Sequence, residues 1–271
     1  MQKIKLGIIG TGLAAEILHW PALKKLQDRI EISAVCNRTL EKAIKFAKLV
    51  GCQSWYSDYK EMLTKEDLHA VLVCTPIFLN YPITEACVKA GKHVLCEKPP
   101  GVNLEEAQKM VTLSQNADQT ILIGENYYYR DDLNKAQELL EAGKIGNLFL
   151  IRIETMLNID ANQSWTSRKW RIEPAHRGGI VSDAGVHHMA AFRMFAGEVV
   201  ELSGFELDVY PEVKDSDNLL LNLRFKNHVL GQYTATYTAV AQHSILFRMA
   251  IYGDKGSIFI TDGRLEIFSE G

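Results

Sequence analysis

The sequence lacks any paired arrangement of cysteines. Its 271 residues include five cysteines, at positions 36, 52, 74, 87 and 96, and no two of them form a Cys-x-x-Cys pair. Three of them, Cys36, Cys74 and Cys96, end short apolar runs. We therefore interpret the cysteines as small buried side chains in a reducing compartment, an interpretation that disfavours both a disulfide framework and a metal site.

Long apolar runs and an excess of basic charge are also missing. No run approaches the roughly 20 apolar residues that a membrane-spanning helix requires. The chain carries 30 basic and 33 acidic residues, a formal net charge of -3, which argues against nucleic acid or an anionic membrane as a partner. The N-terminus leads directly into an apolar run without a signal-peptide pattern, so we expect a cytoplasmic protein.

A glycine-rich loop follows the first apolar run, residues 4–9, which we interpret as a buried strand. In the sequence Gly10-Thr11-Gly12-Leu13-Ala14-Ala15, Gly10 suits a tight turn and Gly12 lets the backbone approach a pyrophosphate. The helix that follows would direct free N–H groups toward the phosphates, until Pro21 breaks or kinks it. The pattern favours a dinucleotide-binding loop over an ordinary turn. The residues that we assign to the cofactor here are Gly10, Gly12, Leu13 and Ala14.

The end of the second predicted strand, residues 30–36, bears on the choice of cofactor. It is followed by Asn37-Arg38, where an NAD-specific site usually has an acidic residue for the ribose hydroxyls. An arginine can instead pair with a 2′-phosphate. We therefore favour NADP over NAD, the alternative being a solvated arginine ahead of a helix.

Further strands alternate with helices up to Gly124, which predicts a doubly wound parallel sheet of the Rossmann type over residues 1–124. One strand ends in Thr75-Pro76, and another ends in Glu97-Lys98, followed by two prolines and a glycine. Because ligands of such sheets bind beyond the carboxyl ends of the strands, this second strand end is a candidate site.

The pattern changes period after residue 125 and predicts a mostly antiparallel, open sheet in an α+β domain over residues 125–271. We expect helices on one face and, because the other face also carries apolar residues, a second subunit there. The expected strands cover residues 148–157, 200–209, 218–225, 229–238, 245–252, 257–261 and 265–268.

A second motif lies between the first two of these strands and ends in Asp183, Ala184, Gly185, Val186 and His187. On a helix, Asp183 and His187 would lie four residues apart on one face. A structural pair and a proton-transfer pair fit this spacing equally well. A metal site fits less well, because no third ligand stands at a recognisable spacing.

Together these motifs resemble those of the glucose–fructose oxidoreductase and inositol dehydrogenase (Gfo/Idh/MocA) family. The motifs that carry the resemblance are Gly10-x-Gly12-x-x-Ala15, Thr75-Pro76, the run from Gly91 to Pro99, and Gly178-Gly179-x-x-x-Asp183-x-Gly185-x-His187. The resemblance implies an NAD(P)-dependent oxidoreductase that interconverts a secondary alcohol and a ketone on a sugar, sugar acid or cyclitol. It also implies oligomer contacts through the open sheet.

Carried over by position, the resemblance implies that Lys98 stabilises the reacting oxygen, that His187 accepts or donates the proton and that Asp183 orients His187. The residues expected beside the cofactor are Thr75, Pro76, Glu97 and Asn126, and those expected beside the substrate are Tyr129, Trp170, Arg171 and His188. No metal ligand is expected.

Two departures from the family pattern stand out. Ile77 and Asn80 occupy positions where the family often has a polar residue and a histidine, and the chain stops at Gly271, so we expect a C-terminally incomplete second domain. Two other activities fit the same fold: a non-catalytic dinucleotide sensor, and a glycosidase that uses bound NAD in a redox-assisted cycle.

Overall fold

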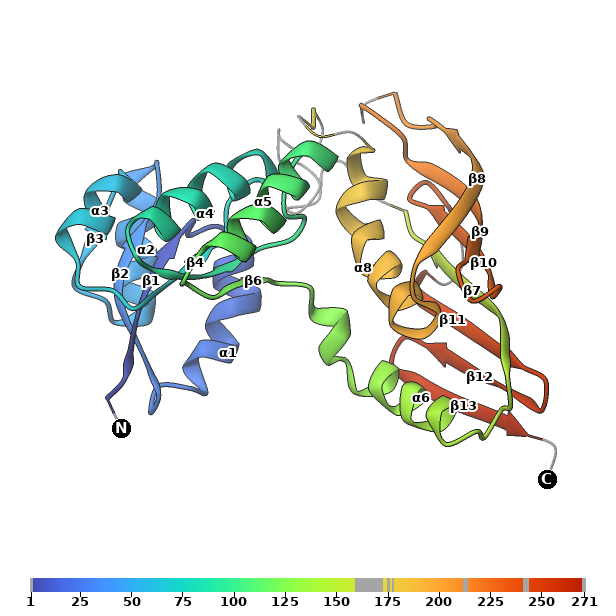
Figure 1. Ribbon diagram of the computed structural model, residues 1–271. Coiled ribbons are helices and arrows are strands. Elements are labelled where there is room, and N and C mark those ends of the chain that lie inside the picture. Colours follow the sequence, from blue (N-terminus) through green and yellow to red (C-terminus); the bar gives the residue numbers. More distant parts are fainter. Residues whose placement is uncertain are drawn as a thin grey trace. The chain divides into compact units, whose positions relative to one another are not determined.

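The computed structural model describes residues 2–158, 173–174, 176, 178–211, 214–240 and 244–269 (Figure 1). The chain divides into two compact units, Met1–Gly124 and Glu125–Gly271. Among the described residues, no helix combines the length and the apolar character needed to cross a membrane.

The first unit is built on a six-stranded sheet in which all neighbouring strands are parallel, as predicted. Its strands are β1 (Ile4–Ile9), β2 (Ile30–Cys36), β3 (Trp55–Tyr56), β4 (Ala70–Val73), β5 (His93–Cys96) and β6 (Ile121–Ile123). The strand order is β3-β2-β1-β4-β5-β6. The direction of winding therefore reverses between β1 and β4, the place where open parallel sheets bind ligands.

Helices cover both faces of this sheet. They are the π-helix η1 (Ala15–His19), α1 (Trp20–Lys24), α2 (Leu40–Val50), α3 (Tyr59–Lys65), the 3-10 helix η2 (Ile77–Leu79), α4 (Asn80–Lys89) and α5 (Leu104–Asn116). One buried cluster joins Val73 of β4 to Ile83 of α4 and Met110 of α5. Another joins Ile8 of β1 to Phe46 of α2. Burial on both faces explains why these strands read as continuous apolar runs.

Pro21 lies in the first turn of α1, and the segment directly before it is the π-helix η1. Here the N–H of Trp20 donates to the carbonyl of Ala15, five residues earlier. Proline has no N–H to donate and its ring crowds the carbonyl four residues before it. The irregularity predicted at Pro21 is therefore present as one wide turn ahead of the proline.

The second unit contains a seven-stranded sheet in the order β13-β12-β11-β7-β10-β9-β8. Its strands are β7 (Leu148–Met156), β8 (Val199–Leu207), β9 (Asn218–Phe225), β10 (Leu230–Thr236), β11 (Ile245–Gly253), β12 (Gly256–Thr261) and β13 (Arg264–Ser269). Only β7 and β10 pair in parallel; the other neighbours are antiparallel, as predicted. The described helices of this unit are η3 (Asn126–Tyr129), α6 (Asp131–Glu141) and α8 (Gly179–Ala196).

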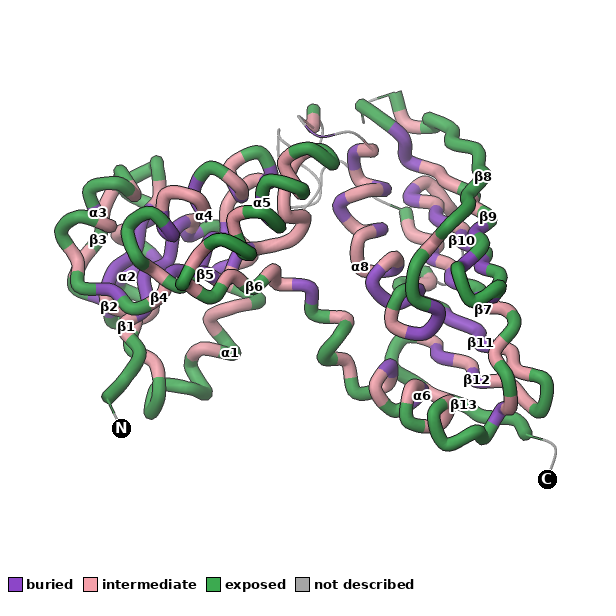
Figure 2. Tube along the Cα trace, in the orientation of Figure 1, coloured by how far each residue is buried: buried purple, intermediate pink, exposed green. Residues whose placement is uncertain are grey.

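The two faces of this sheet differ. Alternate residues such as Ile151, Tyr233 and Met249 are buried in one cluster with Phe192 of α8 and Leu133 of α6. Figure 2 shows the contrast between the largely buried α8 and the exposed β8. The alternation follows from the period of two in a strand, because only one face has helices to pack against.

Helix α8 begins and ends at glycines. Gly178 precedes it with a φ of 81°, and its N–H donates to Asp215 Oδ2 at 2.7 Å. Gly197 ends it with a φ of 78°. Inside the helix, a Cβ on Gly185 would lie 3.4 Å from the hydroxyl of Tyr233, an ordinary van der Waals distance. The helix carries Asp183 and His187 on one face, as their spacing predicts.

Candidate active site

The glycine-rich loop connects β1 to the first helical turn, and its two glycines have different environments. Gly10 has a φ of 97°, and a Cβ there would lie 2.1 Å from the carbonyl oxygen of Cys74. A Cβ on Gly12 would meet nothing within 4 Å. Ala15 is fully buried. The open space above Gly12 and the close packing of Ala15 fit the approach of a dinucleotide pyrophosphate. Leu13 and Ala14 begin the helical turn that follows.

Asn37 and Arg38 lie at the carboxyl end of β2. The side-chain oxygen of Asn37 accepts a hydrogen bond from the backbone N–H of Thr39 at 3.0 Å, which fixes the turn into α2. Arg38 is exposed. An exposed guanidinium at this strand end is available to a phosphate, and no carboxylate stands at either position to accept from ribose hydroxyls.

Asn80 explains one of the departures from the family pattern. It is fully buried, and its side-chain nitrogen donates to the carbonyls of Glu97 at 2.9 Å and Pro99 at 2.8 Å. Its side-chain oxygen accepts from the hydroxyl of Thr75 at 3.2 Å. Asn80 therefore ties the ends of β4 and β5 together and holds the loop that carries Lys98.

Glu97 is held by His19, a residue that no sequence motif singled out. His19, the last residue of η1, places Nε2 at 2.6 Å from Glu97 Oε1, and each side chain is about one-fifth exposed. The other oxygen of Glu97 accepts from the backbone N–H of Lys98 at 3.2 Å. A histidine in the first helix after a glycine-rich loop was the available signal, but its partner lies 78 residues away.

Cys74 joins His19 and Glu97, so that three potential metal-binding atoms lie within 4.8 Å of one another. Burial is the main cause that raises the pKa of the Cys74 thiol, with smaller contributions from Glu97 and Cys96. A thiol that stays protonated is a poor metal ligand, because metals bind the thiolate. The arrangement is better explained as a hydrogen-bonded histidine–carboxylate pair beside a buried thiol.

In the second unit, the carboxylate that contacts the predicted catalytic histidine is Glu125. Its Oε1 lies 2.7 Å from His187 Nδ1, and the residue is only 8% exposed. Glu125 also caps η3 by accepting from the backbone N–H of Tyr127 at 3.0 Å. Asp183, for which the family resemblance implies the orienting role, is buried one turn earlier on α8. An acid two residues after the end of β6 was a usable signal for Glu125.

Tyr127 covers the ring of His187. The two rings are stacked with centroids 4.9 Å apart and an interplanar angle of 16°. The guanidinium of Arg130 lies over the rings of Tyr127, at 4.6 Å, and Phe247, at 4.4 Å, and it also pairs with Asp132. His187 is thus held by a carboxylate at its edge and by an aromatic ring on its face.

The residues predicted to contact the cofactor or the substrate in the second unit have different surroundings. Two of them are exposed on η3: Asn126, assigned to the cofactor, and Tyr129, assigned to the substrate. His188 is 4% exposed, and its Nδ1 lies 2.8 Å from the hydroxyl of Tyr233, an environment typical of a structural histidine. Trp170 and Arg171 lie outside the described residues.

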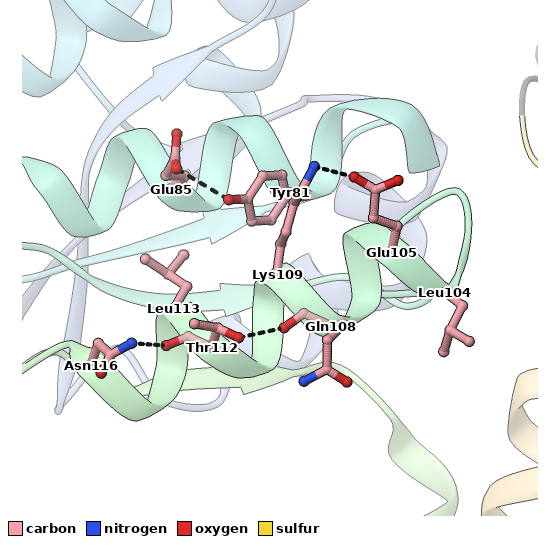
Figure 3. Close-up of a pocket in the computed structure, with 9 residues that line it drawn as sticks. All are labelled: Tyr81, Glu85, Leu104, Glu105, Gln108, Lys109, Thr112, Leu113 and Asn116. Atoms are coloured by element: carbon pink, nitrogen blue, oxygen red, sulfur yellow. Dashed lines mark hydrogen bonds and ion pairs between the residues drawn. The ribbon is translucent and has the colours of Figure 1, made fainter.

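A groove of about 730 Å³ lies along α4 and α5 in the first unit (Figure 3). Tyr81 lies along α4 and donates to Glu85 of the same helix, while Lys109 pairs with Glu105 on α5. None of the predicted site residues lines it. It belongs to the helix layer and not to the carboxyl ends of the strands, so we do not assign the chemistry to it.

Two family profiles together match nearly the whole chain. Residues 4–125 match the family profile described as "Oxidoreductase family, NAD-binding Rossmann fold", and residues 133–259 match the "GFO/IDH/MocA C-terminal domain". A crystal structure of an oxidoreductase from Thermotoga maritima is 36% identical, with a TM-score of 0.91, and the match covers 99% of this chain and 84% of that one.

Two relatives are named as dehydrogenases of inositol and of levoglucosan. Myo-inositol 2-dehydrogenase of Thermotoga maritima is 29% identical over 96% of this chain and 76% of its own length. Levoglucosan dehydrogenase of Pseudarthrobacter phenanthrenivorans is 24% identical over 95% of this chain and 73% of its own length. With both of its domains matched, the chain belongs to the Gfo/Idh/MocA family of oxidoreductases, whose first domain is an NAD-binding Rossmann fold.

Proposed function

We propose that this protein is an NAD(P)-dependent oxidoreductase that interconverts a secondary alcohol and a ketone on a sugar, sugar acid or cyclitol. The observation that carries the proposal is the contact between His187 Nδ1 and the carboxylate of Glu125. A carboxylate holds its Nδ1, so Nε2 is the nitrogen available for proton transfer. The names of the inositol and levoglucosan dehydrogenases support the substrate class.

The residues of the first unit would hold the cofactor, which supplies the hydride acceptor when bound. Gly12 and the following N–H groups would bind the pyrophosphate, with Gly10, Leu13 and Ala14 shaping the turn. The strand ends with Thr75, Pro76 and Glu97 would flank the nicotinamide, together with Asn126. In this proposal residues 1–124 form the cofactor domain and residues 125–271 the substrate and oligomerisation domain.

For the chemical step, we assign the reacting oxygen to two side chains. As hydride leaves the carbinol carbon, the hydroxyl proton passes to His187 Nε2. The ammonium of Lys98 donates a hydrogen bond to the same oxygen and stabilises the negative charge that develops on it. Asp183, which lies one turn earlier on the same face of α8, completes the proposed catalytic set. The substrate candidates are Tyr129, Trp170, Arg171 and His188.

We favour NADP as the cofactor because Arg38 is exposed at the end of β2 and no acid accompanies it. We also propose a homo-oligomer formed through the open face of the second sheet. There Phe205, which is 82% exposed, pairs across the strands with Leu220, which is 53% exposed. A cytoplasmic location stays a prediction from the sequence.

The decisive experiment is a panel of polyols, sugars and sugar acids assayed at 340 nm with NAD and with NADP. We expect turnover with at least one compound, release of reduced cofactor, and a higher kcat/KM with NADP. On the best substrate, Lys98→Met should lower kcat by about 10²-fold or more, the range of one oxyanion-stabilising donor. Exposed Lys89→Met serves as the control.

Four outcomes would contradict parts of the proposal. Near-normal turnover by Lys98→Met would show that Lys98 does not stabilise the reacting oxygen. Cofactor binding without any turnover would indicate a sensor. Substrate hydrolysis without release of reduced cofactor would indicate a redox-assisted glycosidase, and an NAD preference would exclude the role given to Arg38.

A further inference from the structure

Glu125 is a buried carboxylate whose hydrogen bonds are concentrated on one oxygen. Oε1 accepts both from the backbone N–H of Tyr127, at 3.0 Å, and from His187 Nδ1, at 2.7 Å. Oε2 is buried and has no hydrogen-bond partner among the residues that the structure describes. A buried carboxylate with so few donors is stabilised by any positive charge that arrives beside it, because burial has removed its hydration.

The group that can acquire such a charge is His187. An ionised carboxylate can only accept hydrogen bonds, so the Nδ1 atom that faces Glu125 carries its proton and Nε2 is left as the acceptor. When Nε2 takes a proton, the resulting imidazolium lies directly against Glu125. The same contact thus selects the tautomer before proton transfer and stabilises the charge after it.

The ring of His187 has little freedom to turn away from this contact. Tyr127, whose backbone is fixed to Glu125, stacks on the face of His187 at 4.9 Å. Asp183 has different surroundings: burial is the main cause of the raised pKa of Tyr237, and the charge of Asp183 adds to it. Asp183 therefore lies close enough to Tyr237 to act on it, whereas the hydrogen bond that His187 Nδ1 donates is accepted by Glu125.

We infer that Glu125 is the positioning residue of His187, holding it in the tautomer that accepts a proton at Nε2 and stabilising its protonated form. This inference rests on the proposed function, because it makes Glu125 part of the same proton-transfer step. Glu125 does not itself touch the reacting atoms and so acts only through His187.

The first test needs no substrate. In the full-length protein labelled with ¹⁵N-histidine, NMR should show His187 with the proton on Nδ1, the signal being assigned by its loss in His187→Gln. Glu125→Gln should change this signal by moving the tautomer or the ring hydrogen bond. Glu138→Gln, an exposed acid on α6, should leave it unchanged. An Nε2-protonated His187 in the wild type would overturn the inference.

The second test uses turnover on the substrate found in the panel. We expect Glu125→Gln to lower kcat by about 10²-fold, the lower range of general acid–base catalysis, and to leave KM within about threefold. Glu125→Asp, which keeps the charge, should recover part of the loss. Equal kcat values for Glu125→Gln and the wild type would overturn the inference even if His187→Gln is inactive. Absence of turnover in the wild type would instead refute the proposed function. The NMR result would then still decide whether Glu125 fixes the tautomer of His187.

Discussion

The fully buried Asn80 offers the sharpest test of how the strand ends of the first unit are held. Replacing it with alanine removes the donor to the carbonyls of Glu97 and Pro99 and the acceptor for Thr75. Leaving a buried acceptor without a donor costs about 1–3 kcal/mol. Two such carbonyls give an expected loss of about 2–6 kcal/mol in the free energy of unfolding.

Urea denaturation followed by circular dichroism measures this loss. With a slope of about 2 kcal/mol per molar urea, a loss of 3 kcal/mol lowers the midpoint of the first unit's transition by roughly 1.5 M. Asn80→Asp keeps the side-chain volume but turns an oxygen toward two carbonyl oxygens, so it should destabilise at least as much. The control is Asn116→Ala on α5, whose exposed amide donates only to Thr112 within its own helix.

The result also bears on chemistry, because the two carbonyls that Asn80 holds flank Lys98. A folded Asn80→Ala protein should therefore also show a lower kcat. If its urea midpoint stays within about 0.3 M of the wild type, as in the control, the amide contacts make no net contribution and the explanation for Asn80 is wrong.

Two further predictions concern other parts of the molecule. Gly10→Ala should lower the free energy of unfolding by about 3 kcal/mol or more, because Gly10 has a positive φ and a Cβ there would meet a backbone carbonyl. Gly12→Ala should change the free energy of unfolding by less than about 1 kcal/mol. It should nevertheless weaken cofactor binding at least tenfold, as measured by calorimetry. Equal stability losses would contradict this distinction. Burial alone would raise the pKa of Asp132, but Arg130 and backbone donors lower it below 3.8 overall. The stability that the ionised Asp132 contributes should therefore be present at pH 7 and vanish as the pH falls below 3.8. Asp132→Asn should lower the free energy of unfolding by about 1–2 kcal/mol at neutral pH and leave it unchanged in acid. The control Asp131→Asn, at an exposed position, should change the free energy of unfolding little at either pH.

The fold was predictable because local patterns determine most of it. Apolar runs alternating with capped helices indicated the parallel sheet, and the change to a period of two indicated the antiparallel sheet. The parallel pairing of β7 with β10 was not predictable, because strand order depends on contacts between distant segments.

The candidate site was predictable only in part, for the same reason. Lys98 and His187 belong to motifs, whereas the partners of Glu97 and His187 lie 78 and 62 residues away from them. His187 and His188 are neighbours in sequence, and yet one contacts Glu125 and the other contacts Tyr233. Successive helical residues point in different directions, and only the packing of α8 decides which of them faces the core.

The contrast between the two glycines has a consequence for reading divergent members of this family. Gly10 is demanded by the protein's own backbone, whereas the space at Gly12 is left for a ligand. A descendant that has lost its cofactor but kept its fold should retain the first glycine and accumulate side chains at the second. Comparing the two positions therefore separates two kinds of selection. The position of Gly10 indicates selection for folding, and the position of Gly12 indicates selection for nucleotide binding.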